Sequence, residues 1–523
     1  MANNQNPLNK IYQRDRVIVI PGVKGGLARD LYEDLTIQTY QAATDVDVYS
    51  NRNSIRPVFP ALQDMALPSQ DAGATAVKVF NTYLSSNGKY YLHGEETISA
   101  VVNNALWETS ALAASPTYSR DFNNAGLSGN YPLEEYKDGL FFSDRHLFKR
   151  WGNLSGSPSA TTIGTLGTTT ERYGHFLNHK GLAKIFFTHG DGGVYTKIGW
   201  YDNSTFTEGV LSFGAGFNIV SVQEAGQFVL IGIKATNDGQ RSRYLLWDGA
   251  AVTVEDSQDL GDVGLNGIRM VNGVANIVTL NIGQTSAETV MRISTAIPGY
   301  TPQLQFQQRL AATAGVLDRT FEVYGNIMYF GLDNIGLYTY GTRILNVPKY
   351  TSNLRLMNGA PTSWTYLSVR VFGSVMIICW IDTSSGNVYK MSTTGISSSQ
   401  SAPSTGIYTS DLIPIDDNLE FKGSIKKIKI YHKTLPANCG YTVWVKQYGR
   451  YIPGTTVPSA DTFTKVGTIT AANSEYAVIE DDGVNFDLCD SFQLQIKLDT
   501  VSGANYPEVL FPIIIRAGIS GTK

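Results

Sequence analysis

The residues best suited to metal or acid–base chemistry gather in one short stretch that carries three of the six histidines. These are His175, His179 and His189, within the segment YGHFLNHKGLAKIFFTHGDGG. A metal site needs three or four converging ligands held by ordered neighbours. This segment instead has the composition of turns and strands, and His189 leads into a glycine-rich turn. We therefore predict no metal site and no cofactor.

Sequence motifs for hydrolysis, phosphoryl transfer or dinucleotide binding are missing. The chain has no GxSxG, HExxH or P-loop pattern and no GxGxxG in a strand–helix context. The segments DGGVY and DNIGLY only partly match the repeated S-x-D-x-G-x-T-W signature of sialidase propellers. The acidic run at residues 45–51, DVDVYSN, lacks the glycine and terminal glutamate of a calcium loop and predicts a solvated strand face. We expect no enzymatic activity and assign no catalytic residue.

Composition narrows the choice of partners. The formal net charge is −4, so no broad basic field favours nucleic acid. No run of about 18 apolar residues is present and the N-terminal MANNQNPLNK is polar, so we expect neither a membrane span nor a secretory signal. The cysteines Cys379, Cys439 and Cys489 lie far apart; Cys379 is predicted to be a buried thiol, and no disulfide is assumed.

The elements that must position any site follow from an internal repeat. Its clearest copy, Tyr324–Gly341, has an apolar strand, a turn with Asn334 and Gly336, and a tyrosine-rich return strand. Similar strands are centred near residues 90, 141, 186, 230, 277, 328 and 376. This spacing of about 47 residues is typical of four-stranded propeller blades. We predict an all-β fold with a propeller of about seven blades at residues 66–403; unrelated hairpins in a large sandwich are the alternative.

Two further patterns bear on this propeller. The low-complexity segment Gly152–Thr170 is predicted to be a long surface loop, and Ser392–Gly406 a linker that ends the propeller. Four tryptophans near turns are expected to pack between blades, with a sugar-stacking surface as the alternative; they are Trp107, Trp151, Trp200 and Trp247.

Beyond the linker the sequence changes to alternating apolar and polar residues, which is typical of strands with one buried face. The apolar positions include Ile428 and Ile430, Val443 and Val445, and the series Phe492, Leu494, Ile496 and Leu498. We predict a jelly-roll-like β-sandwich at residues 404–523 and an arm with leading strands at residues 1–65.

Three segments resemble tail-associated structural proteins of tailed bacteriophages. Thr409–Arg450 resembles the strand pair that opens their C-terminal sandwich, Phe321–Gly341 resembles their propeller blades, and Gly25–Pro60 resembles the strands that precede such propellers. The resemblance implies a virion protein of the tail, baseplate or neck, assembled in the host cytoplasm. Its implied partners are other virion proteins, further copies of this chain and a host-surface glycan. A carbohydrate-binding or glycoside-cleaving propeller is the alternative function.

The N-terminal arm supplies the predicted assembly residues. A polar lead of about 15 residues runs into the apolar strand formed by Val17, Ile18, Val19 and Ile20. The backbone of this strand needs partners, either in the last propeller blade or in a sheet of another subunit. We predict that it acts in assembly.

Overall fold

A computed structural model describes most of the chain as two compact units. The described residues are 12–23, 26–27, 39–48, 53–57, 63–68, 74–127, 129–237, 240–261, 264–282, 289–310, 318–341, 351–355, 364–382, 386, 388–395, 405–416, 421–449, 462–470, 474–483, 485–499 and 505–521. One unit comprises residues 1–61, 338–359 and 395–523, and the other comprises residues 62–337 and 360–394. Within the described residues, no helix has the length and apolarity needed to cross a membrane.

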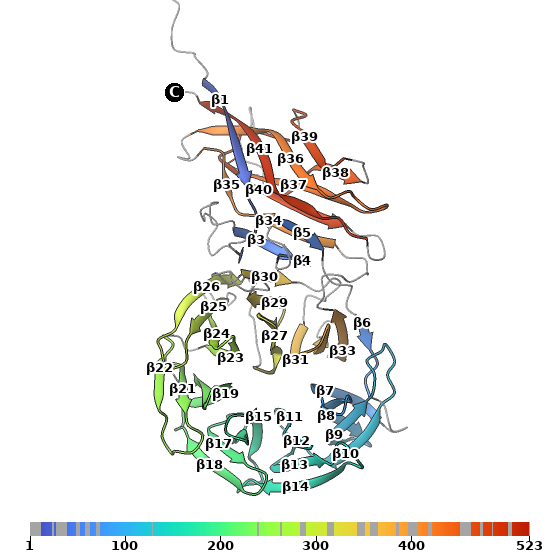
Figure 1. The fold of residues 1–523 in the computed structure, drawn as a ribbon, viewed down its shortest axis with the longest axis vertical. Helices are drawn as coiled ribbons and strands as arrows, with labels where there is room; N and C mark the ends of the chain where they lie inside the picture. The colour runs from blue at the N-terminus through green and yellow to red at the C-terminus, as the bar shows by residue number, and fades with distance from the viewer. Residues whose placement is uncertain are drawn as a thin grey trace, which may run out of the picture. The chain divides into compact units, whose positions relative to one another are not determined.

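The second unit is a β-propeller of seven four-stranded antiparallel sheets (Figure 1). The division between the units falls inside the sixth sheet. The first sheet contains β7 (Ala74–Leu84), β8 (Tyr90–Ile98), β9 (Val101–Thr109) and β10 (Ser119–Ala125), and the second contains β11 (Leu133–Glu135), β12 (Gly139–Asp144), β13 (Leu147–Gly152) and β14 (Ser159–Thr165). The third contains β15 (Arg172–His179), β16 (Lys184–Gly190), β17 (Lys197–Tyr201) and β18 (Phe206–Ser212), and the fourth contains β19 (Phe217–Ala225), β20 (Phe228–Ala235), β21 (Arg243–Trp247) and β22 (Asp256–Asp259). The fifth contains β23 (Leu265–Val271), β24 (Val274–Ile282), β25 (Thr289–Ala296) and β26 (Gln303–Leu310), and the sixth contains β27 (Phe321–Tyr324), β28 (Ile327–Leu332), β29 (Gly336–Gly341) and β30 (Thr351–Arg355).

The seventh sheet closes the ring with a strand from the N-terminal part of the chain. It contains β31 (Trp364–Phe372), β32 (Val375–Asp382), β33 (Val388–Gly395) and β6 (Gln63–Met65). In the pairing of β6 with β33, Met65 lies opposite Met391. Met65 is buried, and Ser392 Oγ donates a hydrogen bond to Asp64 Oδ1 at 2.8 Å. A distant strand thus joins the two ends of the propeller, as closure of a ring of sheets requires.

The propeller prediction is confirmed, and the seven repeat centres all fall in or at the start of the second strand of a sheet. The preceding strand of each sheet lies nearest the centre of the ring, and these inner strands contact one another around it. The surface loop predicted at Gly152–Thr170 is wrong in part, because β14 forms the outer strand of the second sheet there. Most of its side chains are exposed, so backbone pairing rather than apolar burial sustains it.

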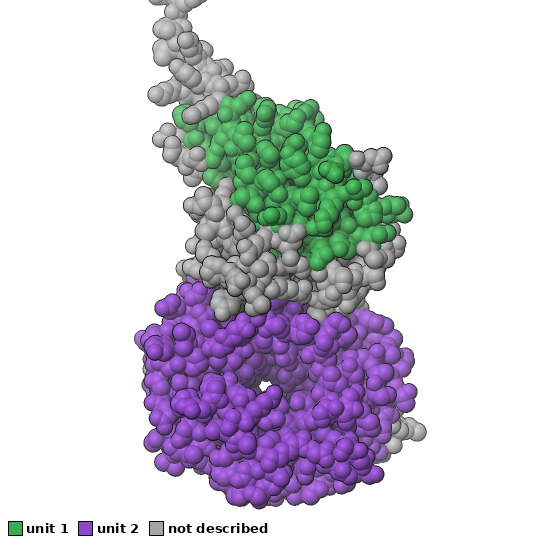
Figure 2. All heavy atoms as spheres, viewed as in Figure 1, with its two compact units in different colours: residues 1–61, 338–359, 395–523 green, residues 62–337, 360–394 purple. Residues whose placement is uncertain are grey.

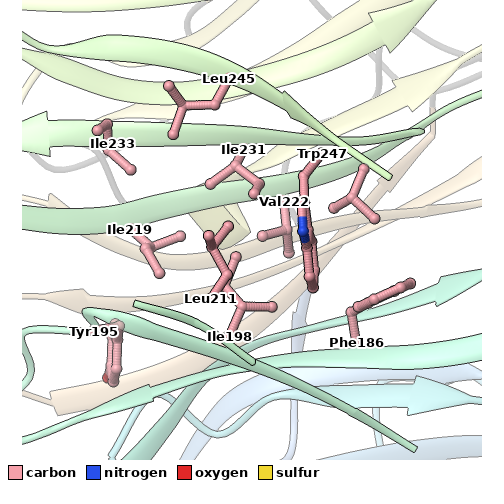
Figure 3. Close-up of a cluster of buried hydrophobic side chains, with 11 residues drawn as sticks. Phe186, Tyr195, Ile198, Leu211, Ile219, Val222, Ile231, Ile233, Leu245 and Trp247 are labelled. Atoms are coloured by element: carbon pink, nitrogen blue, oxygen red, sulfur yellow. The ribbon is translucent and has the colours of Figure 1, made fainter. Parts of the chain in front are cut away.

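Apolar side chains fill the space between neighbouring sheets, as Figure 3 shows for the third and fourth. Phe186 of β16 packs edge to face on Trp247 of β21, with ring centroids 5.5 Å apart. Trp107 and Trp247 are fully buried, which confirms the packing prediction for these two. Cys379 is buried in a similar cluster, and burial raises the pKa of its thiol to about 11.

The first unit is a β-sandwich, and its strands come from both ends of the chain. One sheet has the order β39 (Tyr476–Glu480), β36 (Lys422–His432), β41 (Val509–Gly521), β5 (Ser54–Pro57) and β4 (Val46–Asp47), and β1 (Tyr12–Ile20) also pairs with β41. The other has the order β2 (Gly26–Leu27), β3 (Thr39–Thr44), β34 (Thr405–Ser410), β40 (Ser491–Asp499), β37 (Gly440–Tyr448) and β38 (Thr464–Thr470), with β35 (Ile413–Pro414) beside β40.

The alternation predicted for the C-terminal strands is confirmed. Ile428, Ile430, Val443 and Val445 are all buried, as are the apolar positions of β40. The N-terminal segment differs from the predicted separate arm, because β3 pairs with β34 and both β1 and β5 pair with β41. The proposed solvated face at residues 45–51 is also wrong for Asp45 and Asp47, which are buried; Asp47 forms an ion pair with Arg56 at 3.3 Å. Residues 396–404 of the predicted linker lie outside the described part of the chain.

Candidate functional site

The four predicted assembly residues lie on β1, at an edge of the sandwich. β1 pairs antiparallel with β41, with Ile18 opposite Ile515 and Ile20 opposite Ile513. The strand therefore finds its partner within its own chain and does not close the last blade, which β6 does. Along the opposite edge of β1, no strand of the described residues is paired with it. That edge leaves backbone donors and acceptors able to receive another strand.

The side chains of β1 alternate sharply between the core and the surface. Ile18 and Ile20 are 3% and 2% exposed, whereas Val17 and Val19 are 57% and 43% exposed. Arg16 holds the strand in place by donating hydrogen bonds to the carbonyls of Pro414 and Ile415, at 3.2 and 2.7 Å. The alternation thus divides the predicted residues into two buried anchors and two that are open to a partner.

Val19 belongs to a row that crosses four strands of the outer sheet face. The strand registers align Val19 with Ile514 of β41, Lys429 of β36 and Val478 of β39. We call these four residues the edge row. Val478 is 38% exposed, and the Lys429 ammonium lies 4.6 Å from the ring centroids of both Tyr431 and Tyr476. The row is therefore an apolar strip interrupted by one lysine.

One arginine and one lysine side chain lie beside the edge row on the same sheet face. Val17 is aligned with Arg516, which is exposed, and Arg516 is in turn aligned with Lys427. Lys427 is paired with Glu480 at 2.9 Å, but neither Arg516 nor Lys429 has an ion pair among the residues that the structure describes. A partner that supplies apolar and acidic side chains would complement this surface.

A second candidate site occupies the centre of the propeller. Figure 2 shows an opening through this unit, and a cavity of about 250 Å³ is lined by residues from all seven sheets. Its polar lining includes Asn81, Asn130, Glu134, His175, Gln223, Arg269, Asp318, Arg319, Glu322 and Arg370. The inner strands and the short 3-10 turn η2 (Asp318–Thr320) position these side chains.

Two of the three arginines in the channel are matched by carboxylates. Arg269 binds Asp318 through Nη1 and Nη2, at 2.7 and 3.3 Å, and its Nε donates to the Phe321 carbonyl. Arg370 contacts Glu322 at 3.2 Å through Nη1 and Asn81 at 3.2 Å through Nε. These bonds tie the fifth, sixth, seventh and first sheets together at the level of the cavity.

The third arginine, Arg319, reaches across the channel without a carboxylate partner among the described residues. Its Nη1 donates to the Asn130 carbonyl at 2.9 Å and to the Asn130 side chain, and its Nε donates to the Leu367 carbonyl. Its guanidinium lies 5.5 Å from the centroid of the Phe80 ring. Burial lowers the pKa of Arg319 to about 10, which still leaves it charged at neutral pH.

The carboxyl group of Glu134 has a raised pKa. Burial raises its pKa to about 8, although Arg370 and the Tyr83 hydroxyl, which is 3.4 Å from Glu134 Oε1, oppose the shift. An acid with this pKa can donate a proton near pH 7.

The three clustered histidines lie in separate surroundings. His175 lines the channel, with Nδ1 3.6 Å from Asp318; burial lowers its pKa. His179 Nε2 contacts the Phe228 carbonyl at 2.9 Å, and His189 Nδ1 contacts Glu171 at 2.8 Å. No group of three potential metal ligands occurs in the described part of the chain. Arg269, Arg319 and Arg370 were not predicted as site residues, since they are about 50 residues apart in the sequence and only the closed ring of sheets brings them together.

No family model and no curated protein matches this sequence. Among solved structures, the chain is similar to the WD40 domain of Toxoplasma gondii coronin, with 10% identity, coverage of 68% of this chain and 89% of that chain, and a TM-score of 0.39. It is also similar to the Neurospora crassa Pan2 WD40 domain, with 10% identity, coverage of 64% and 95%, and a TM-score of 0.42. An exo-β-1,3-galactanase from Phanerochaete chrysosporium has 12% identity, coverage of 87% and 99%, and a TM-score of 0.30.

Proposed function

We propose that this chain is a non-enzymatic structural component of a tailed-phage particle and that it docks to another virion protein through β1. The observation that carries the proposal is the edge of β1 that pairs with no strand of the described residues, with Val17 and Val19 exposed beside it. Apolar strand edges are a liability that proteins normally cover. A strand added by a partner would satisfy the backbone of β1 and cover the exposed Val17 and Val19.

The basic surroundings specify the chemistry of the docking strand. Arg516 and Lys429 flank the exposed valines and have no ion pairs among the described residues. In an extended segment every second side chain shares the face of the edge row. We expect this set of positions to include apolar residues beside Val17 and Val19 and a carboxylate directed towards Arg516. The resemblance to phage tail proteins makes another virion protein the proposed source of that segment.

The double variant Val17→Lys/Val19→Lys tests this role. Both side chains point to solvent, so the thermal transition should shift by only a few degrees. Co-sedimentation with tails or virions assembled without the protein should be lost, because two ammonium groups cannot be buried against a basic patch. The matched control Val101→Lys/Val252→Lys changes two exposed valines of the propeller and should sediment normally. Normal incorporation of the β1 variant would exclude docking through this edge.

One observation favours glycan cleavage as a second candidate function. Glu134 has the raised pKa of a general acid and shares the channel with the side chains of Asp318 and Glu322. Each of those carboxylates is bound by an arginine, which makes it a weaker base or nucleophile. Hydrolysis of surface polysaccharides that disappears in Glu134→Gln would establish this activity; no turnover in the unaltered protein would exclude it for the glycans assayed.

A further inference from the structure

The charge inside the propeller channel does not balance. Arg269, Arg319 and Arg370 contribute three positive charges to the cavity lining, while Asp318 and Glu322 contribute two negative charges. Glu134 is mostly protonated at pH 7, because burial raises its pKa to about 8. Burial also lowers the pKa of His175, which is therefore neutral. The lining thus carries one excess positive charge, which would attract an anion into the channel.

The arginine N–H groups that have no hydrogen bond to the described residues indicate the kind of group that would match this charge. All three guanidinium nitrogens of Arg269 donate hydrogen bonds to protein groups. Arg319 and Arg370 each use Nε and Nη1, and the Nη2 of each has no hydrogen bond to the described residues. Arg319 donates through Nε to the carbonyl of Leu367, three residues before Arg370 on β31, and both arginines line the cavity. Two like charges with spare donors are therefore neighbours in one cavity.

We propose that the propeller channel binds a small oxyanion, a carboxylate or phosphate group, through the Nη2 groups of Arg319 and Arg370. Oxyanions accept several charge-assisted hydrogen bonds at once and would relieve the repulsion between the two guanidinium groups. The cavity of about 250 Å³ is smaller than the roughly 300–1,000 Å³ of sites for drug-sized ligands. The ligand is therefore a small molecule, and its binding is independent of docking through β1.

Calorimetric titration of the full chain at pH 7 with sodium acetate and, separately, with sodium phosphate tests the site. Sodium chloride at matched ionic strength is the reference. We expect saturable binding of at least one oxyanion and about tenfold or greater weakening in Arg319→Gln and Arg370→Gln, because each loses a charge-assisted donor. Arg243→Gln, at an exposed arginine of β21, should bind like the unaltered protein. Heat no greater than with chloride, or equal affinity in all variants, would overturn the proposal.

A pH series provides a readout that does not depend on the folding of the arginine variants. Glu134 faces Tyr83, Glu135, Glu322 and Arg370, and its ionisation above about pH 8 adds a negative charge that cancels the excess. Acetate keeps a single charge between pH 7 and 9, so its affinity should fall severalfold over this range. Glu134→Gln should abolish the fall. A decline of equal size in both proteins would contradict the charge assignment.

Discussion

The propeller and the sandwich obtain their closing strands from the same N-terminal segment but depend on it to different degrees. In the propeller, strands pair with their neighbours along the chain, and only the three-residue β6 pairs with a strand distant in sequence, β33. In the sandwich, β1–β5 come from the first 57 residues, and three of them, β1, β3 and β5, pair with strands beyond residue 404. The propeller is thus dominated by local pairing, and the sandwich by contacts between chain ends.

Deletion of residues 396–523 should produce the largest difference between the units. It removes β34 and β41, the partners of β3, β5 and β1, so the strands of residues 12–57 should lose their pairing with the rest of the sandwich. The propeller keeps β6 and should retain a cooperative thermal transition. Limited proteolysis with mass spectrometry should therefore show cleavage within residues 12–57 while residues 74–395 stay protected. Protection of the N-terminal strands, or loss of the propeller transition, would show that the units are not closed as described.

The two units should respond to pH in opposite directions at two specific carboxyls. In the propeller, burial raises the pKa of Glu134 from 4.5 to about 8, so the unfolded chain ionises first as pH rises. The propeller should lose up to roughly 5 kcal/mol between pH 4.5 and 8, and Glu134→Gln should remove this loss. Calorimetry across this range measures the effect. If the stability of Glu134→Gln depended on pH as that of the unaltered protein does, the loss of stability would belong to other groups.

In the sandwich, Glu508 has the opposite linkage. Burial opposes ionisation, but hydrogen bonds from Lys433 and Ser54, at 2.7 and 2.6 Å, lower the pKa of Glu508 below 4.5. This stabilisation is complete above pH 4.5 and is lost as pH falls through the lowered pKa. Glu508→Gln should therefore destabilise the sandwich at neutral pH and lessen its sensitivity to acid, which melting curves at pH 3 to 7 can resolve.

The contrast between the units also explains which features the sequence could predict. Strands such as Ile327–Leu332 and Val375–Asp382 are largely apolar on both faces and recur at a fixed period, because each sheet is buried between two neighbours. Pairing of Val17–Ile20 with β41 joins residues about 500 apart, and no local pattern encodes it. The cluster of arginines in the channel could not be predicted from the sequence either, since each arginine is an ordinary polar residue within its own repeat. The exposed strand β14 was not predicted, because its backbone pairing rather than burial of apolar side chains holds it in the sheet.

The last prediction compares the two closing strands directly, because each strand has one buried side chain that can be truncated to alanine. Its expected effect on stability is the smallest of those predicted here. Met65→Ala should destabilise the propeller, and Ile18→Ala the sandwich, each by about 2–4 kcal/mol, the usual cost of removing a buried side chain of this size. The surface residue Val19, next to Ile18 on the same strand, is the matched control, and Val19→Ala should cost about 0.5 kcal/mol or less. Calorimetry should show that each buried-site variant shifts only the transition of its own unit, because β6 pairs with β33 and β1 with β41. A shift of both transitions by either variant would mean that the units unfold as one, and that the N-terminal segment couples them rather than closing each separately.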